Sequence, residues 1–381
     1  MRKIWPFTFY LLYFAANAFF LPYLVLYYQS LDFSATQIGL LIAISPLITL
    51  IGAPFWTGIA DLTQRHKLVM STMLLLIVGF SLMFPFVKTI AAIFVLVLLF
   101  SFMVAPINSL ADTATISMLG DDKHIYGRVR VGGTIGWGVA APIAGVLIGR
   151  YGLPWAFWSY SILMFIGFIV SQKFVFNQGK RESSFIHGLR ALLSNQRLIL
   201  FLFTAFVCGM AFTSINAYLF AYMEQLGISK ILMGFALSIA TLSEVPMFFY
   251  SDKLLARFKP QGMLIGAMVV TTLRLFLYAI FSTAVGILVF QLMNGVTFSA
   301  VWVAGVSYAN ENAPVGLSAT AQGVFGAMLF GFGSAAGGFL SAILFAKVGG
   351  AQMYAIFGAL MFVTLMAYLL LDKRFPKVPY A

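Results

Sequence analysis

"FLPYLVLYYQSLDFSATQIG", residues Phe20 to Gly39, returns in altered form as "INAYLFAYMEQLGISKILMG", residues Ile215 to Gly234. The two stretches align without gaps at a constant offset of 195 residues. Matching pairs include Tyr23 with Tyr218, Leu24 with Leu219, Leu31 with Leu226, Ser34 with Ser229 and Gly39 with Gly234. A repeat at about half the chain length indicates two copies of one structural unit.

The composition places this chain in a membrane. Of its 381 residues, 61% are hydrophobic and only 9% are charged, and the mean hydropathy is +0.98. A soluble core of this length could not hide so much apolar surface. We therefore expect an all-α integral membrane protein whose spans have about 20 apolar residues each.

Twelve stretches of about that length follow one another along the chain. The first six run over about 7–28, 36–59, 68–86, 89–112, 131–149 and 154–174, and the second six over about 198–222, 230–250, 262–281, 284–306, 318–345 and 352–371. The start also resembles a signal peptide, since a basic region precedes an apolar run and Ala16-Asn17-Ala18 mimics a cleavage site. Because the apolar run continues to Tyr28, a span is the favoured interpretation.

The basic residues predict the orientation. With both termini cytoplasmic, all but five of the 23 Lys and Arg lie on cytoplasmic ends and loops. The exceptions are Lys88, Arg150, Lys230 and Lys347 outside and Arg274 within the bilayer. This asymmetry follows the positive-inside rule, so the net charge of +12 requires no nucleic acid partner. We expect the cytoplasmic (inner) membrane of a bacterial-type cell.

The repeat and the number of spans together resemble the major facilitator superfamily, whose transporters have two parallel six-span halves. The resemblance implies twelve transmembrane helices in two pseudo-symmetric halves. An N-terminal six-helix bundle would cover 1–175, a cytoplasmic linker 176–197, and a C-terminal six-helix bundle 198–381.

Two short loops are similar to that superfamily's signature between its second and third helices. "TGIADLTQRHK" contains Asp61 and Arg65, and "FYSDKLLARFK" contains Asp252 and Arg257. An Asp at a helix end can accept hydrogen bonds from a neighbouring helix N-terminus or an Arg. These residues would then form a cytoplasmic gate. Solvated charge that sets the topology is the alternative.

Two charged residues lie deep in the predicted spans, where charge is rare and functional by default. Glu244 lies eight residues before Asp252, about 12 Å along its helix, and Arg274 lies twelve residues into the ninth span, about 18 Å along it. Desolvation and a nearby cation act in opposite senses on the protonation of a carboxyl group, so helix movement can switch it. We interpret the pair as proton-coupling residues. A purely structural buried ion pair is the alternative.

A third group lies where the fourth span ends and the fifth begins, and consists of Asp112 and residues of "YGRVRVGGTIGWG", Tyr126 to Gly138. Asp112 closes one span and Arg130 opens the next, while Arg128, about 200° away around the same helix, must face elsewhere. Trp137 follows Arg130 by two turns on the same face. An arginine below an aromatic plate suits a small polar solute with one apolar face. Snorkelling of these charges to the surface is the alternative.

Over essentially its whole length, and most specifically from Asp112 to Trp137, the chain resembles the family of the lactose permease, with its phenylpropionate-permease-like and nucleoside:proton symporter relatives. The resemblance implies that Arg130 binds sugar, that Trp137 stacks on a sugar ring, and that Asp112 is an acidic ligand. It also implies that Glu244, in "LSEVPMFF", joins solute binding to protonation, and that Arg274, in "TTLRLF", assists deprotonation.

The tenth span departs from that pattern. Where the permease family has its coupling histidine and glutamate, this chain has Asn294 and Thr297, within "QLMNGVTFS". Proton coupling would then depend on Glu244 or Asp112, and a uniporter is an open alternative. Asn294 and Asn216 come from helices that line the cavity in the resembled fold, so we expect both to bind solute.

The sequence lacks the residue patterns for metal binding within the spans, for a disulfide and for nucleotide hydrolysis. His66, His124 and His187 all fall in predicted loops, so no metal site is expected. Cys208 is the only cysteine and has no disulfide partner. The sequence contains no GxxxxGK phosphate loop. We therefore expect no enzyme activity, no cofactor and no metal.

The sequence thus predicts a secondary active transporter, monomeric in the lipid bilayer. It would move a small organic solute, sugar-like or an aromatic acid, by alternating access with proton symport. A uniporter and a proton-coupled drug or metabolite exporter are the alternatives within transport. A receptor or scaffold with a transporter fold is the alternative outside it, and the charges of Asp112, Arg130, Glu244 and Arg274 argue against it.

Overall fold

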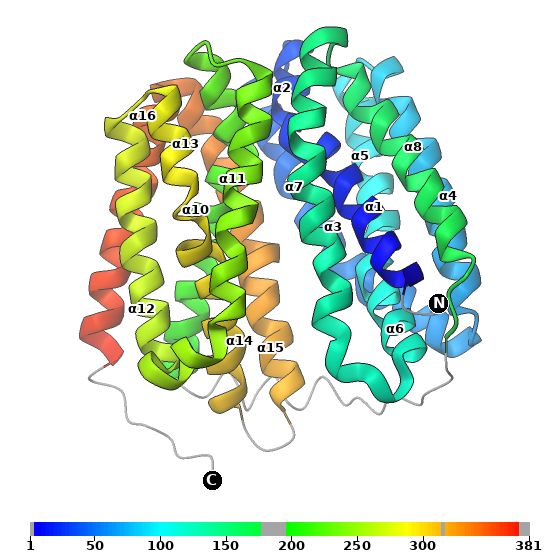
Figure 1. Cartoon of the computed structure of the whole chain (residues 1–381). Coiled ribbons are helices and arrows are strands. Elements are labelled where there is room, and N and C mark those ends of the chain that lie inside the picture. The colour runs from blue at the N-terminus through cyan, green and yellow to red at the C-terminus, as the bar shows by residue number, and fades with distance from the viewer. Residues whose placement is uncertain (1–3, 177–195, 314–316, 373–381) are drawn as a thin grey trace. The chain divides into compact units, whose positions relative to one another are not determined.

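A computed structural model describes residues 4–176, 196–313 and 317–372 (Figure 1). Within these ranges, eleven helical stretches are long and apolar enough to cross a membrane. The last, Thr320–Asp372, has 53 residues, which is about 80 Å of helix and too long for one crossing of a hydrocarbon layer about 30 Å thick. Its backbone leaves helical geometry at Gly349, where φ is +79°, so it holds two crossings. The expectation of an all-α protein with twelve spans is confirmed.

The contacts divide the chain into two compact units, which we describe separately. Unit 1 comprises Met1–Lys180 and Gly227–Ser238, and unit 2 comprises Arg181–Leu226 and Ile239–Ala381. The predicted linker over 176–197 lies almost wholly outside the described residues. Helix α11 (Lys230–Phe249) contributes its first part to unit 1 and its second part to unit 2.

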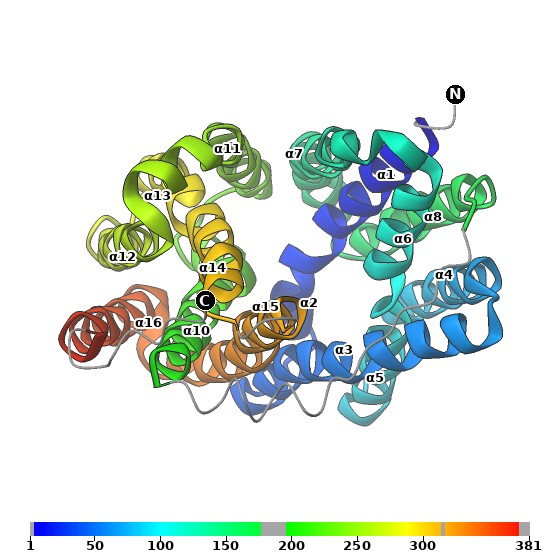
Figure 2. The same cartoon turned by 90° about the horizontal axis from the view of Figure 1, so that it is seen from below.

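Unit 1 is built around its first helix. Its elements are α1 (Ile4–Phe20), η1 (Leu21–Tyr23), α2 (Leu24–Ser30), α3 (Ala35–Thr63), α4 (His66–Met83), η2 (Phe84–Phe86), α5 (Ile90–Val104), α6 (Ile107–Leu119), η3 (Gly120–Ile125), α7 (Tyr126–Tyr151) and α8 (Pro154–Ser171). Helix α1 packs along both α7 and α8, and the view from below shows it between them (Figure 2). It is therefore the central helix for the residues of α6 and α7 discussed below.

Glycines allow α7 to approach α1 closely. A Cβ atom at Gly132 would meet the backbone carbonyl of Phe7, and one at Gly136 would meet the backbone of Leu11. Small residues spaced by four are a common means of bringing membrane helices together. The glycine-rich run after Arg130 thus sets the distance between α1 and the helix that carries this arginine.

The repeated serines have the same structural role in both copies. Ser34 precedes α3, where its side chain accepts a hydrogen bond from the Gln37 amide while the Gln37 side chain accepts from the Ser34 amide. Ser229 precedes α11, and its hydroxyl accepts from the Leu232 amide at 3.5 Å. A serine N-cap supplies an acceptor for amides that lack a helical partner. The sequence repeat therefore begins the second span of each half in the same way.

Unit 2 contains two stretches of π-helical geometry. Its elements are α10 (Gln196–Gln225), the second part of α11, α12 (Ser251–Ile280), α13 (Ala284–Gln291), the π-helix η4 (Gly295–Ser299), α14 (Ala300–Glu311), α15 (Ser318–Gly326), the π-helix η5 (Ala327–Gly333) and α16 (Ser334–Asp372). Glycines again permit close approach, since a Cβ at Gly209 would meet the Leu329 carbonyl and one at Gly337 would meet the Met210 backbone.

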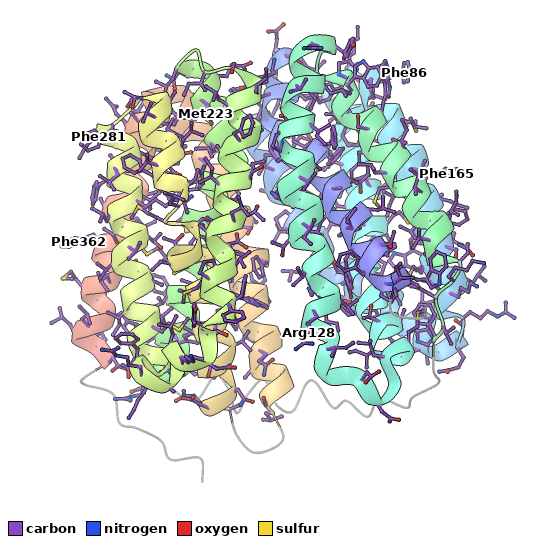
Figure 3. All side chains as sticks on the ribbon, in the orientation of Figure 1. Phe86, Arg128, Phe165, Met223, Phe281 and Phe362 are labelled. Atoms are coloured by element: carbon purple, nitrogen blue, oxygen red, sulfur yellow. The ribbon has the colours of Figure 1, made fainter. Side chains whose placement is uncertain are left out.

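Large apolar side chains project from the outside of both units. Phe86 and Phe165 in unit 1, and Phe281 and Phe362 in unit 2, are all exposed (Figure 3). Exposed phenylalanine in such numbers would be unfavourable in water, but hydrocarbon solvates it. The surface is thus consistent with the apolar composition of the sequence.

Candidate functional site

One candidate group lies in unit 1 and consists of Tyr10, Asp112, Tyr126 and Arg130, which we call the Arg130 cluster. Arg130 Nη1 donates hydrogen bonds to Asp112 Oδ1 at 2.6 Å and to the Tyr126 hydroxyl at 2.7 Å. The Tyr10 hydroxyl donates to the same Asp112 oxygen at 2.5 Å. The cluster therefore joins α1, α6 and α7 around one carboxylate.

The Arg130 cluster is partly open to its surroundings. The side chains of Arg130 and Asp112 are 39% and 31% exposed, and the Arg130 guanidinium lies 5.6 Å from the centroid of the Tyr10 ring. An ion pair held by charge-assisted hydrogen bonds and backed by an aromatic ring is well ordered. Because the ion pair is partly exposed, its remaining hydrogen-bond donors and acceptors are accessible to a solute.

The two arginines of the "GRVR" run have different environments. Arg130 pairs with Asp112, whereas Arg128 is exposed (Figure 3). This matches the expected separation of about 200° around the helix. Trp137, two turns beyond Arg130 on α7, is partly exposed, so its ring is available for contact.

A second candidate group lies in unit 2, around a buried arginine. We call it the Arg274 cluster: Glu244, Arg274, Tyr278, Gln291, Asn294 and Thr297. The Arg274 side chain is only 1% exposed. Its guanidinium donates to Asn294 Oδ1 at 2.8 Å, to Gln291 Oε1 at 2.7 Å, to Thr297 Oγ1 at 3.0 Å and to the Tyr278 hydroxyl at 3.2 Å.

Asn294 connects the cation of this cluster to its carboxylate. Its side-chain oxygen accepts from Arg274, while its Nδ2 donates to Glu244 Oε1 at 2.6 Å. Among the residues that the structure describes, no Lys or Arg nitrogen lies within 4.0 Å of the Glu244 carboxylate. A direct ion pair between Glu244 and Arg274 is therefore not formed. The amide relays hydrogen bonding between two charges in a region where unpaired charge is costly.

The tenth-span residues that depart from the permease pattern are thus integral to the Arg274 cluster. Gln291, Asn294 and Thr297 follow one another at intervals of three, from the end of α13 into η4, and all three bind the same guanidinium. Gln291 Nε2 is buried without a hydrogen-bond partner. Its orientation follows from Arg274, because a flipped amide would point its donors at the guanidinium.

The predicted gate residues lie at helix ends, and Asp61 has a different partner from the one expected. Asp61, at the end of α3, bonds His66 Nε2 at 2.7 Å, while Arg65 is exposed. The His66 ring stacks on Phe176 at 5.5 Å. Asp252 and Arg257 are both exposed at the start of α12. The gate function of these residues stays a prediction.

Asn216 is exposed on α10 and has no place in either cluster. No group of three or more His, Cys, Asp or Glu side chains that could hold a metal ion occurs within residues 4–176, 196–313 and 317–372.

Sequence reasoning missed four residues that hold the clusters together. Tyr126 lies four residues before Arg130, and Tyr278 lies four residues after Arg274. Both could have been found, because residues four apart share a helix face. Tyr10 is 102 residues from Asp112 and carries no local signal. Gln291 was visible only as a polar residue on an apolar span.

Twelve spans in two repeated units, with charged groups inside the spans, define a membrane transporter of the major facilitator type rather than an enzyme. The chain matches the MFS_1 like family over residues 5–356, and it belongs to that family. The resemblance to the major facilitator superfamily is confirmed.

Named relatives agree with this assignment. The chain is 23% identical over 375 residues to the maltose permease of Geobacillus stearothermophilus, and the alignment covers 98% of this chain and 95% of that protein. It is 28% identical over 277 residues to the multidrug resistance protein MdtG of Salmonella paratyphi C, covering 68% of each. The crystal structure of the nucleoside transporter NupG shares the fold, with a TM-score of 0.87, 20% identity, and coverage of 98% of this chain and 99% of that one.

Proposed function

We propose that this protein is a proton symporter that moves a small organic solute, sugar-like, nucleoside or aromatic acid, across the membrane by alternating access. It would act as a monomer in a bacterial cytoplasmic membrane with both termini inside. The proposal rests on transport as the shared activity of its relatives and on the chemistry of the two clusters.

The environment of Glu244 is the observation that carries the proton coupling. The carboxylate lies in a membrane span and has a neutral amide as its hydrogen-bond donor. A carboxyl group placed in this way can hold a proton in one state of the protein and release it in another. Arg274 lies one amide away, so a shift of α11 relative to α12 and η4 would change the electrostatic environment of the carboxylate.

The Arg130 cluster supplies the solute-binding groups of the proposal. A guanidinium and a carboxylate that are partly exposed offer several donors and acceptors for hydroxyl groups, and Trp137 offers an aromatic face. Sugars and nucleosides have both hydroxyl-rich and apolar faces. The names of relatives include a maltose permease and a nucleoside transporter, which favours these two solute classes over aromatic acids.

The test is solute-induced alkalinisation of a weakly buffered suspension of de-energised cells that express the protein. Maltose-type sugars, galactosides, nucleosides and phenylpropionate-like acids are added separately, and uptake of the radiolabelled solute is followed in parallel. We expect one class to cause alkalinisation, and Glu244→Gln to abolish it. The control is Glu311→Gln, since Glu311 is an exposed carboxylate at the end of α14 and should keep full coupling.

Two outcomes would contradict proton symport. Uptake of solute without a pH change in the wild type would indicate a uniporter, in agreement with the tenth-span departures at Asn294 and Thr297. Lower accumulation of lipophilic cations in expressing cells would indicate an exporter, the function that the likeness to MdtG favours. Alkalinisation that persists in Glu244→Gln would show that a residue other than Glu244 carries the transported proton.

A further inference from the structure

Unit 1 contains a cavity of about 400 Å³ that is separate from the Arg130 cluster. Residues of three helices line it, among them Leu11 and Phe19 of α1, Ile135, Val139 and Ile143 of α7, and Ile162 of α8. Apart from the Ser159 hydroxyl, every lining side chain is apolar. The cavity therefore suits a hydrocarbon ligand.

The cavity exists because α7 and α8 each pack on α1 but contact each other little. Figure 1 shows α1 behind the gap between these two helices, and Figure 2 shows the same order from below. Ala140, which lines the cavity, has too little side chain to fill that gap. At the rim, Val139, Ile143 and Ile162 are 60%, 50% and 56% exposed, so the cavity is a groove that opens outward from the unit.

One end of the groove leads to a positive charge. Arg150 is exposed and lies seven residues after Ile143 on α7, which is two turns further on the same helix face. The Tyr151 and Trp155 rings lie 5.4 Å apart, and Trp155 lies 5.5 Å from Trp158, the neighbour of Ser159. Tyr and Trp gather at the level of lipid headgroups. Arg150 is therefore placed where a lipid phosphate lies.

The dimensions match one phospholipid molecule. From Ile135 at the far end of the groove to Arg150 is fifteen residues of helix, or about 22 Å. One leaflet with its headgroups is half of a bilayer about 40 to 45 Å thick. The lining residues of α7 run from Ile135 to Ile143, about 12 Å of helix, and a chain of methylene groups can lie along an apolar groove of this length. A single acyl chain is the occupant of the right shape.

We propose that this groove binds one acyl chain of an anionic phospholipid whose phosphate group is held by Arg150. The lipid would fill the space between α7 and α8 and would tie both helices to α1. Its binding is independent of the transported solute.

Native mass spectrometry of the protein, released from nanodiscs that contain equal amounts of phosphatidylglycerol and phosphatidylcholine with the same acyl chains, tests the proposal. We expect the wild type to retain one lipid with about a fivefold preference for phosphatidylglycerol. Arg150→Gln should lose the preference but keep a lipid, because the groove is intact. Val139→Trp and Ile162→Trp fill the groove from its rim, and each should retain at least fivefold less of either lipid.

The control variants make the same kinds of substitution at exposed positions away from the groove. Lys347→Gln removes another exposed cation, and Ile169→Trp adds a large ring at an exposed position of α8 outside the groove. Both should behave as the wild type. Wild-type retention in the two groove variants, unchanged preference in Arg150→Gln, or no retained lipid in the wild type would overturn the proposal. A dimer mass that disappears in the groove variants would assign the groove to a second copy of the chain instead.

Discussion

Replacing Asn294 with leucine would remove both hydrogen bonds that connect Arg274 to Glu244 while keeping a branched side chain of similar shape. Hydrogen bonds between membrane helices contribute about 0.6 kcal/mol on average and about 1.7 kcal/mol at most. Both partners of Asn294 carry charge, and its bonds are short, at 2.8 and 2.6 Å, so the upper value applies to each. We expect Asn294→Leu to lower the free energy of unfolding by about 3 kcal/mol.

The assay is unfolding of the protein in mixed micelles by titration with sodium dodecyl sulfate. Asn108→Leu is the matched control, because Asn108 donates one long hydrogen bond of 3.4 Å to the Tyr13 hydroxyl and its Oδ1 is buried without a partner. Removing it should change the free energy of unfolding by less than about 0.5 kcal/mol. The difference between the two variants isolates the charged contacts.

A double-mutant cycle with Glu244→Gln separates the bridge from simple packing. A glutamine at 244 can still accept from Asn294, but as a neutral partner, so the coupling between positions 244 and 294 should be about 1 kcal/mol. If Asn294→Leu is as stable as the wild type, or if the cycle gives no coupling, the amide does not connect the two charges and the reasoning is wrong.

Two further predictions concern unit 1. Gly136→Ala should lower the free energy of unfolding by about 1 to 3 kcal/mol, because its Cβ would meet the backbone of Leu11. Gly127 faces open space, so Gly127→Ala should not lower it. Equal stability of the two variants would refute the close-approach argument. Arg130→Lys should raise the Michaelis constant of solute uptake about tenfold, because a single amine cannot replace the two-pronged guanidinium and losing one charged hydrogen bond costs about 1.5 kcal/mol. Arg128→Lys should leave the Michaelis constant unchanged. Equal effects of the two variants would show that Arg130 does not bind the solute.

The spans were predictable from sequence because the bilayer imposes a length and an apolar composition on each of them. The repeat was also visible, and Ser34 and Ser229 show why: the same residue starts the same helix in each copy. The single helical stretch around Gly349 did not obscure the count, since its length alone requires two crossings.

The candidate site was only partly predictable. Asp112 and Arg130 were recognised as a group, and the structure brings them together. Tyr10 could not be identified, because its contact with Asp112 depends on how α1 packs on α6 and α7 rather than on any local pattern. Asn294 was noted as a departure from a family pattern, yet its two hydrogen bonds depend on the positions of three different helices.

His66 illustrates the same limit at short range. It lies five residues from Asp61 and looked like an ordinary loop histidine. The turn between them places Gln64 in left-handed backbone geometry, with φ of +55°, and this reverses the chain so that the two side chains meet. Sequence spacing alone does not reveal such a reversal for a residue other than glycine.

The π-helix η4 begins directly after Asn294. A π turn differs from an α turn by one additional residue, so deleting a single residue within Gly295–Ser299 is the smallest change that would make this span regular. Because the π turn accommodates that residue, the same deletion would leave Gln291, Asn294 and α14 in nearly the same orientation and would shift only the side chains inside Gly295–Ser299, Thr297 among them. The π turn is therefore needed for the hydrogen bond from Arg274 to Thr297, which lies inside it, whereas the bonds of Gln291 and Asn294, which precede it, do not depend on it.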